Sequence, residues 1–128
     1  MAARGLVRRL DPGSPGLLDL ASNDYLGLAR HPTVVAGAVE AAKHYGAGST
    51  GSRLVTGTTD LHLELEARLA EKLSAEAALV FSSGYLANLG VLTVLAGPGT
   101  LVVSDSGNHA SLIDACRLSR ATVRVVPH

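Results

Sequence analysis

Residues 77–126, AALVFSSGYLANLGVLTVLAGPGTLVVSDSGNHASLIDACRLSRATVRVV, carry the pattern that decides the fold of this chain. Short apolar runs at Ala77–Phe81, Thr100–Val103 and Thr122–Val126 predict three strands, each covered on both faces. A helical segment separates each strand from the next. The order strand, helix, strand, helix, strand is typical of parallel βαβ units, so the sequence predicts an α/β fold with a mostly parallel sheet.

The helices between these strands are predicted over residues 84–96 and 109–120. In the second of them, the apolar spacing points Leu112, Ile113 and Cys116 inward. A sheet of three strands covered on both faces needs more helices than these segments offer. We therefore expect the sequence to be part of a longer protein.

Two further helices are predicted upstream of the strands. Pro32 suits the first position of a helix, and Gly46 is expected to end that helix. After a glycine-rich loop, Asp60 is the expected N-cap of a second helix. Its leucines recur every four residues, and Glu64 and Arg68 are spaced to form an ion pair on another face. Residues 1–30 are predicted to form an arm and a turn-rich segment, and residues 31–128 the start of an incomplete large domain.

Composition excludes several classes of function. The chain has 128 residues, with 11 Lys and Arg against 11 Asp and Glu, so no basic surplus is available to bind nucleic acid. Its single cysteine, Cys116, excludes a disulfide framework and a multi-cysteine zinc site, and no histidines have metal-ligand spacing. No apolar run is long enough for a membrane span, and no secretory signal is visible. We expect a cytoplasmic protein with no membrane partner and no metal.

The junction between the first predicted strand and its helix is a candidate phosphate site. Ser83, Gly84 and Tyr85 lie where amide N–H groups lack partners and the helix dipole is positive. Gly84 would let the backbone approach a ligand closely. The same residues could form an ordinary turn, and the residues alone do not separate these interpretations.

His109 occupies the equivalent junction after the second predicted strand. Ligands of open parallel sheets bind outside the carboxyl ends of the strands, so His109 could face one cleft with Ser83. The alternative is that His109 is a structural residue that caps its helix. A catalytic triad of Asp105, His109 and Ser111 is a poor interpretation, because Ser111 lies within the helix. Asp114 and Arg117 are expected to form a solvated ion pair.

The glycines Gly46, Gly48 and Gly51 match the spacing of a dinucleotide-binding fingerprint. That fingerprint requires a strand before it and a helix that opens at it. Here a helix precedes the glycines and a loop follows them. A nicotinamide-linked oxidoreductase is therefore a minor alternative, and a small non-catalytic α/β module is the main rival to an enzyme.

Four motifs, SNDYLGLARHP, GAGSTGSRLVTGTTDLHLELE, AALVFSSGYLANLG and SDSGNHASLIDACRLSRA, resemble the α-oxoamine synthase family in order and in spacing. These enzymes use pyridoxal 5'-phosphate (PLP) and have the aspartate aminotransferase fold. The resemblance implies a homodimeric C-acyltransferase that condenses an amino acid with an acyl thioester and releases CO₂. The motifs lean toward the biotin-biosynthesis branch, whose substrates are L-alanine and a pimeloyl thioester of acyl carrier protein or CoA. Glycine C-acetyltransferase and 5-aminolevulinate synthase are the alternatives.

The resemblance also implies roles for single residues. Gly84 and Tyr85, with Ser83, match the segment whose backbone holds the cofactor phosphate. His109 matches a histidine that stacks on the pyridine ring and faces the substrate. Asn23 matches an asparagine close to the amino-acid substrate, and Arg8 an arginine near the acyl substrate.

The loop from Gly48 to Arg53 matches a segment that approaches the partner subunit's active site in family dimers. PLP chemistry of this kind requires a lysine, and the chain offers only Lys43 and Lys72, neither within the family's lysine motif. We therefore expect these residues to represent roughly the first third of such an enzyme. Alone, they should have no synthase activity.

Overall fold

The structure is a computed structural model that describes residue 16 and residues 18–128. The chain divides into two compact units, one up to Gly48 and one from Ser49 to His128. The predicted boundary after residue 30 concerns domains of the whole enzyme and stays a prediction. Within the described residues, no helix is long and apolar enough to cross a membrane.

The first unit contains a short 3-10 helix, η2 (Leu28–Arg30), followed by helix α1 (Pro32–Tyr45). The N–H of Leu28 donates to Oδ1 of Asp24 at 2.7 Å, which fixes the turn that leads into η2. Helix α1 begins at the predicted proline. It ends at Gly46, whose φ of 85° lies in the region that favours glycine. Both predicted helix limits are therefore confirmed.

The second unit begins with the glycine-rich loop and helix α2 (Asp60–Lys72). The predicted N-cap was wrong by one residue, because Thr59 has the extended backbone of a cap and Asp60 is already helical. The imidazole Nδ1 of His62 accepts a hydrogen bond from the N–H of Thr59 at 3.2 Å. A histidine therefore takes the place that Glu or Gln has in most capping boxes.

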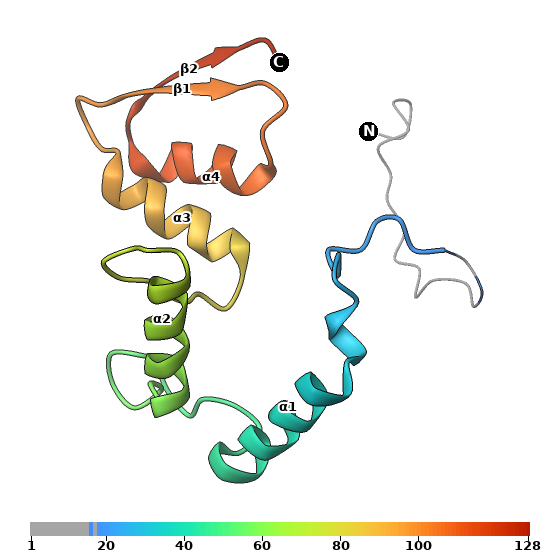
Figure 1. Cartoon of the computed structure of the whole chain (residues 1–128). Coiled ribbons are helices and arrows are strands. Elements are labelled where there is room, and N and C mark those ends of the chain that lie inside the picture. Colours follow the sequence, from blue (N-terminus) through green and yellow to red (C-terminus); the bar gives the residue numbers. More distant parts are fainter. Residues whose placement is uncertain (1–15, 17) are drawn as a thin grey trace. The chain divides into compact units, whose positions relative to one another are not determined.

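Two parallel strands, β1 (Leu101–Asp105) and β2 (Thr122–Val126), form the sheet of the second unit, with Leu101 opposite Thr122 and Asp105 opposite Val126 (Figure 1). Strand β1 extends two residues beyond its predicted end, because Ser104 and Asp105 also pair with β2. Helices α3 (Gly84–Leu95) and α4 (Ala110–Ser119) match their predictions to within a residue at each end. The α/β class is confirmed.

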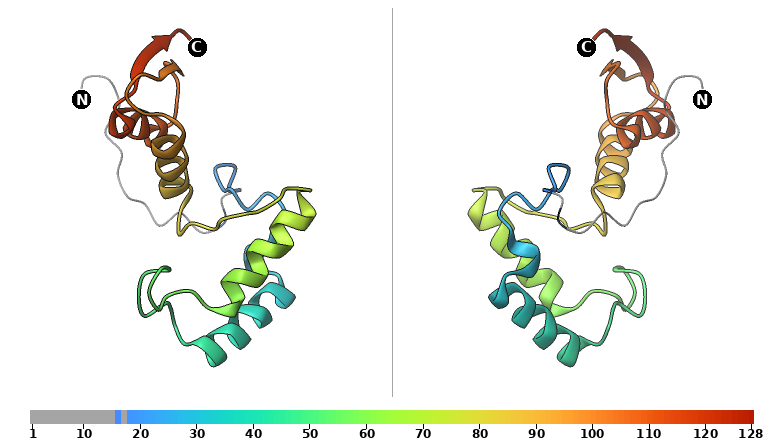
Figure 2. Two further views of the ribbon diagram at one scale, coloured as in Figure 1. Left: turned by 90° about the vertical axis from the view of Figure 1, so that its left-hand side faces the viewer. Right: turned by 90° about the vertical axis from the view of Figure 1, so that its right-hand side faces the viewer.

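Helices α3 and α4 pack against each other (Figure 2). The buried side chains of the described residues are all small, which lets backbones approach closely: Ala96, Ser104, Ser111, Ala115, Cys116 and Ser119. Of the residues predicted to point inward on α4, Cys116 is buried, Leu112 is half-buried and Ile113 is 37% exposed. The small residues of α4, rather than its large apolar ones, form its packed face.

Residues 77–81, predicted as the first strand, pair with no strand among the described residues. The backbone of Val80 forms hydrogen bonds with side chains instead. Its N–H donates to Oε1 of Glu66 at 2.8 Å, and its carbonyl accepts from Nη1 of Arg53 at 3.3 Å. The ring of Phe81 lies against α3 where a Cβ on Gly90 would be 2.9 Å from it. A side chain at position 90 would therefore displace the ring of Phe81.

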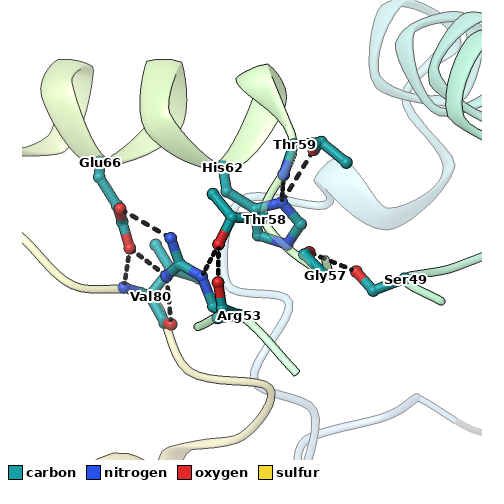
Figure 3. Close-up of polar contacts among 8 residues, drawn as sticks. All are labelled: Ser49, Arg53, Gly57, Thr58, Thr59, His62, Glu66 and Val80. Carbon is teal, nitrogen blue, oxygen red and sulfur yellow. Dashed lines mark hydrogen bonds and ion pairs between the residues drawn. The ribbon is translucent and has the colours of Figure 1, made fainter. Parts of the chain in front are cut away.

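Arg53 and Glu66 form an ion pair that joins three segments of the second unit (Figure 3). Nη2 of Arg53 donates to Oε2 of Glu66 at 3.0 Å, and the Arg53 carbonyl accepts from Oγ1 of Thr58 at 2.7 Å. The pair therefore ties the glycine-rich loop to α2 and to Val80. We call Arg53, Glu66 and Val80 the latch.

The latch shifts the ionisation of its carboxylate. Hydrogen bonds from Arg53 and from the N–H of Val80 lower the pKa of Glu66 from 4.5 to about 2. The Glu66 side chain is 13% exposed, whereas Glu64, paired with Arg68 on the same helix, is 57% exposed. The Glu66 pair is thus less exposed to water, and its carboxylate also accepts from the N–H of Val80.

The lowered pKa predicts a loss of stability in acid. Because Glu66 binds a proton less readily when folded than when unfolded, its contribution is complete above about pH 4.5 and is lost as the pH falls toward about 2. We expect Glu66→Gln to remove this part of the pH dependence. The measurement is the free energy of unfolding in urea between about pH 6 and pH 2.

Glu64→Gln is the matched control for that titration. Its exposed pair with Arg68 is worth no more than about 0.5 kcal/mol, so this variant should follow the unsubstituted protein at every pH. Parallel curves for Glu66→Gln and the unsubstituted protein would contradict the assigned role of Glu66.

Candidate functional site

The N-terminus of α3 is the candidate anion site that the sequence predicts. Ser83 has extended backbone, and its Oγ accepts a hydrogen bond from the N–H of Leu86 at 3.2 Å. The amides of Gly84 and Tyr85 occupy the first turn, where N–H groups have no intrahelical acceptor. A Cβ built on Gly84 meets no atom within 4 Å, so the space beside these amides is open. A phosphate group fits these donors and the positive end of the helix dipole.

The side chain of Tyr85 turns from this open space toward α4. Its hydroxyl donates to Oδ2 of Asp114 at 2.7 Å, while Oδ1 of Asp114 accepts from Arg117 at 3.0 Å. The Tyr85–Asp114 hydrogen bond raises the pKa of Tyr85 and lowers the pKa of Asp114. The predicted pair of Asp114 and Arg117 is confirmed, and the carboxylate has a second partner on α3 that the sequence did not indicate.

His109 is the N-cap of α4. Its Nδ1 accepts a hydrogen bond from the N–H of Ser111 at 3.1 Å and lies 2.7 Å from Oγ of Ser111. Nδ2 of Asn88 on α3 donates to the same Oγ at 2.9 Å. The capping interpretation of His109 is therefore confirmed. It leaves open whether the exposed ring also faces a ligand, because the cap uses only one edge of the ring.

A separate group of hydrogen bonds stabilises the turn that follows the carboxyl end of β1. Oδ1 of Asp105 accepts from the N–H of Gly107 at 2.6 Å, and both carboxylate oxygens lie 3.1 Å from Nδ1 of His128. Nδ2 of Asn108 donates to Oγ of Ser104 at 3.1 Å. These contacts hold the turn that leads to His109.

The structure brings together four of the predicted site residues. Ser83, Gly84 and Tyr85 on α3 and His109 at α4 belong to first turns of two helices that Tyr85–Asp114 and Asn88–Ser111 join. The contributions of Asn88 and Ser111 were missed, because no local pattern marks a residue whose partner is 23 positions away.

Two predicted site residues belong to the other part of the chain. Asn23 lies exposed in the first unit, where its Oδ1 accepts from the hydroxyl of Tyr25 at 3.4 Å. Arg8 lies outside the described residues. The role of each in binding substrate remains a prediction.

Neither lysine belongs to the group formed by the first turns of α3 and α4. Lys43 on α1 is paired with Glu40 at 2.8 Å, and Lys72 is the exposed last residue of α2. Among the described residues, no cluster of three or more His, Cys, Asp or Glu side chains could hold a metal. The chemistry that these residues fit is the binding of a phosphate beside an imidazole ring.

A cavity of about 680 Å³ lies beside the segment that leads into α3, and His62 of α2 is among its lining residues. The glycine-rich loop, residues 79–82 and Leu86 line it. Its cationic group, Arg53, is already committed to Glu66 and Val80. The guanidinium of Arg53 is therefore not free to bind a ligand in this cavity.

The chain belongs to the aminotransferase class I and II family, whose model matches residues 15–128. Within that class it is similar to proteins named 8-amino-7-oxononanoate synthase. The protein of this name from Mycobacterium ulcerans (strain Agy99) is 63% identical over 126 residues, which are 97% of this chain and 32% of the relative. That from Mycobacterium bovis (strain BCG / Pasteur 1173P2) is 66% identical over 111 residues, 87% of this chain and 29% of the relative.

Solved structures support the same assignment. The crystal structure of 8-amino-7-oxononanoate synthase from Francisella tularensis matches with a TM-score of 0.74 at 30% identity, over 90% of this chain and 32% of that one. Serine palmitoyltransferase from S. paucimobilis, with a bound PLP–myriocin aldimine, matches with a TM-score of 0.78 at 39% identity, over 81% and 26%. The fold predicted from the motifs is confirmed, and the chain spans about a third of the length of the curated relatives it matches.

The cap at Ser83 predicts a measurable loss of stability. Ser83→Ala removes the acceptor for the N–H of Leu86 and should lower the free energy of unfolding by about 0.5–2 kcal/mol. Ser82→Ala, one residue earlier and outside the cap, is the matched control and should cost less than about 0.5 kcal/mol. Urea denaturation checks both, and equal losses would show that Ser83 is not an energetically significant cap.

Proposed function

We propose that this chain forms the phosphate-binding and ring-facing part of an 8-amino-7-oxononanoate synthase, a PLP-dependent C-acyltransferase of biotin biosynthesis. The observation that carries the proposal is 63% identity to a protein of that name over 97% of the chain. In this reaction L-alanine is joined to a pimeloyl thioester of acyl carrier protein or CoA, and CO₂ is released. We propose a cytoplasmic homodimer as its working form.

The open first turn of α3 supplies the proposed phosphate site. The amides of Gly84 and Tyr85 would donate to the phosphate at the N-terminal end of the helix. The N–H of Leu86 would take no part, because it donates to Oγ of Ser83. The hydroxyl of Tyr85 is held by Asp114, so the backbone of this residue, not its phenol, is free to bind. When bound, PLP supplies an electron sink for the carbon atom that loses CO₂.

His109 is proposed to lie against the cofactor ring and to face the amino-acid substrate. Its cap engages Nδ1 in the plane of the ring, which leaves both ring faces and Nε2 available. An imidazole face packed on a pyridine ring would hold that ring in one plane. Asn23 and Arg8 are proposed to bind the amino acid and the acyl chain, respectively.

The covalent anchor of PLP has no candidate in this group of residues. Lys43 is paired with Glu40, and Lys72 ends α2 on an exposed face. We therefore propose that residues 1–128 alone do not turn over substrate. The glycine-rich loop held by the latch is proposed to extend toward the partner subunit's active site.

The proposal is tested by assaying the full-length protein with PLP, a pimeloyl thioester and one amino acid at a time. We expect kcat/KM for L-alanine to exceed the values for glycine and L-serine by roughly tenfold or more, the discrimination that one methyl or hydroxyl group allows. Serine is included because serine palmitoyltransferase matches this fold at 39% identity. Equal or faster turnover of glycine or serine would assign another family reaction.

His109→Asn separates stacking from capping. Asparagine can cap α4 but has no ring, so the variant should stay folded and lose about tenfold or more in turnover. His109→Ala loses the cap as well and should also be less stable. Measurements of kcat and of unfolding check both variants. Near-normal turnover of the asparagine variant would leave His109 with a capping role only.

A further inference from the structure

Asn88, Ser111 and His109 form a continuous series of hydrogen bonds from α3 to the cap of α4. We propose that Asn88 and Ser111 are positioning residues that fix the tautomer and the plane of the His109 ring. This inference rests on the proposed function only where it concerns the packing of the His109 ring on the cofactor. The geometry of the series is independent of that function.

The direction of each hydrogen bond follows from the groups involved. The backbone N–H of Ser111 can only donate, so Nδ1 of His109 accepts at 3.1 Å. Nδ2 of Asn88 also can only donate, so Oγ of Ser111 accepts from it at 2.9 Å. The Ser111 hydroxyl hydrogen is then free to point at Nδ1, 2.7 Å away. With Nδ1 accepting, the neutral ring carries its hydrogen on Nε2.

The residues of this hydrogen-bond series differ in burial. Ser111 is fully buried at 0% exposure, and Asn88 is half-buried, so water cannot replace the hydrogen bonds of the serine. His109 itself is exposed. Because the lone pair of Nδ1 lies in the plane of the ring, an acceptor bond there sets the ring plane relative to α4. The exposed edge then presents the Nε2–H group.

Sequence position alone would assign these residues other roles. Ser111 lies within a helix, where a serine most often bonds to its own backbone, as Ser119 does with the carbonyl of Cys116 at 2.8 Å. Oγ of Ser111 instead accepts a hydrogen bond from Asn88 on α3 and lies beside Nδ1 of the N-cap residue His109. Ser119 is equally a buried serine of α4, with 5% exposure, and therefore serves as a matched control.

The test is the tautomer of His109 in full-length protein without cofactor or substrate. Ring-¹⁵N-labelled histidine distinguishes a protonated nitrogen from an unprotonated one, and the spectrum of His109→Asn identifies the signals of His109. We expect the Nε2–H tautomer in the unsubstituted protein and in Ser119→Ala. In Asn88→Asp the carboxylate takes the serine hydroxyl hydrogen, so the ratio of Nε2–H to Nδ1–H should fall roughly two- to tenfold, the factor for one hydrogen bond.

Ser111→Ala should give a smaller fall in the same ratio. It removes the hydroxyl altogether, whereas Asn88→Asp leaves an Oγ lone pair beside Nδ1 that can accept from an Nδ1–H group. An Nδ1–H tautomer in the unsubstituted protein, or an unchanged ratio in Asn88→Asp, would overturn the proposal. In the assayed holoenzyme, Asn88→Asp should lower kcat roughly two- to tenfold with KM unchanged, and Ser119→Ala should change neither. Where His109→Asn loses turnover, so that the ring is shown to be used, an unchanged kcat in Asn88→Asp would also overturn the positioning role.

Failure of the proposed function has a different signature. In that case His109→Asn would keep its turnover, whatever the tautomer of the histidine in the other variants. The ¹⁵N measurement therefore decides the positioning proposal, and the turnover of His109→Asn decides the use of the ring.

Discussion

The ion pair between Arg53 and Glu66 is the contact on which the rest of the second unit depends. It joins a glycine-rich loop, helix α2 and the segment that leads into α3, and it supplies the hydrogen bonds that the backbone of Val80 would otherwise seek from a neighbouring strand. A buried backbone group left unpaired is costly, so this use of side chains is favourable.

The candidate site follows from the packing of α3 on α4. Small residues at their contact let the helices approach. Two polar contacts, Tyr85–Asp114 and Asn88–Ser111, each join the first turn of one helix to the second turn of the other. An anion site at one helix N-terminus and an imidazole at the other are thereby held by the same pair of helices. Neither contact uses the backbone amides or the His109 ring that are proposed to touch the cofactor. The side chains that hold the two helices together are therefore separate from the proposed binding groups.

The proposed division of work agrees with the composition of this chain, which has 14 glycines and, as lysines, only Lys43 and Lys72. The chain would hold the phosphate and one face of a cofactor ring, tasks for backbone amides and an imidazole. The covalent chemistry of PLP needs an amine that neither Lys43 nor Lys72 offers in this site.

Local patterns in the sequence were sufficient for the α/β class, the limits of α1, α3, α4 and β2, and the family resemblance. They also predicted the ion pairs Glu64–Arg68 and Asp114–Arg117. These features depend on residues within a few positions of each other, which periodicity and helix-capping rules describe. The hydrogen bonds of residues 77–81, the second partner of Asp114 and the support of His109 join residues 14 to 29 positions apart. Only the tertiary structure decides such pairs, because the free energy of burying a polar group depends on which partner the fold brings to it.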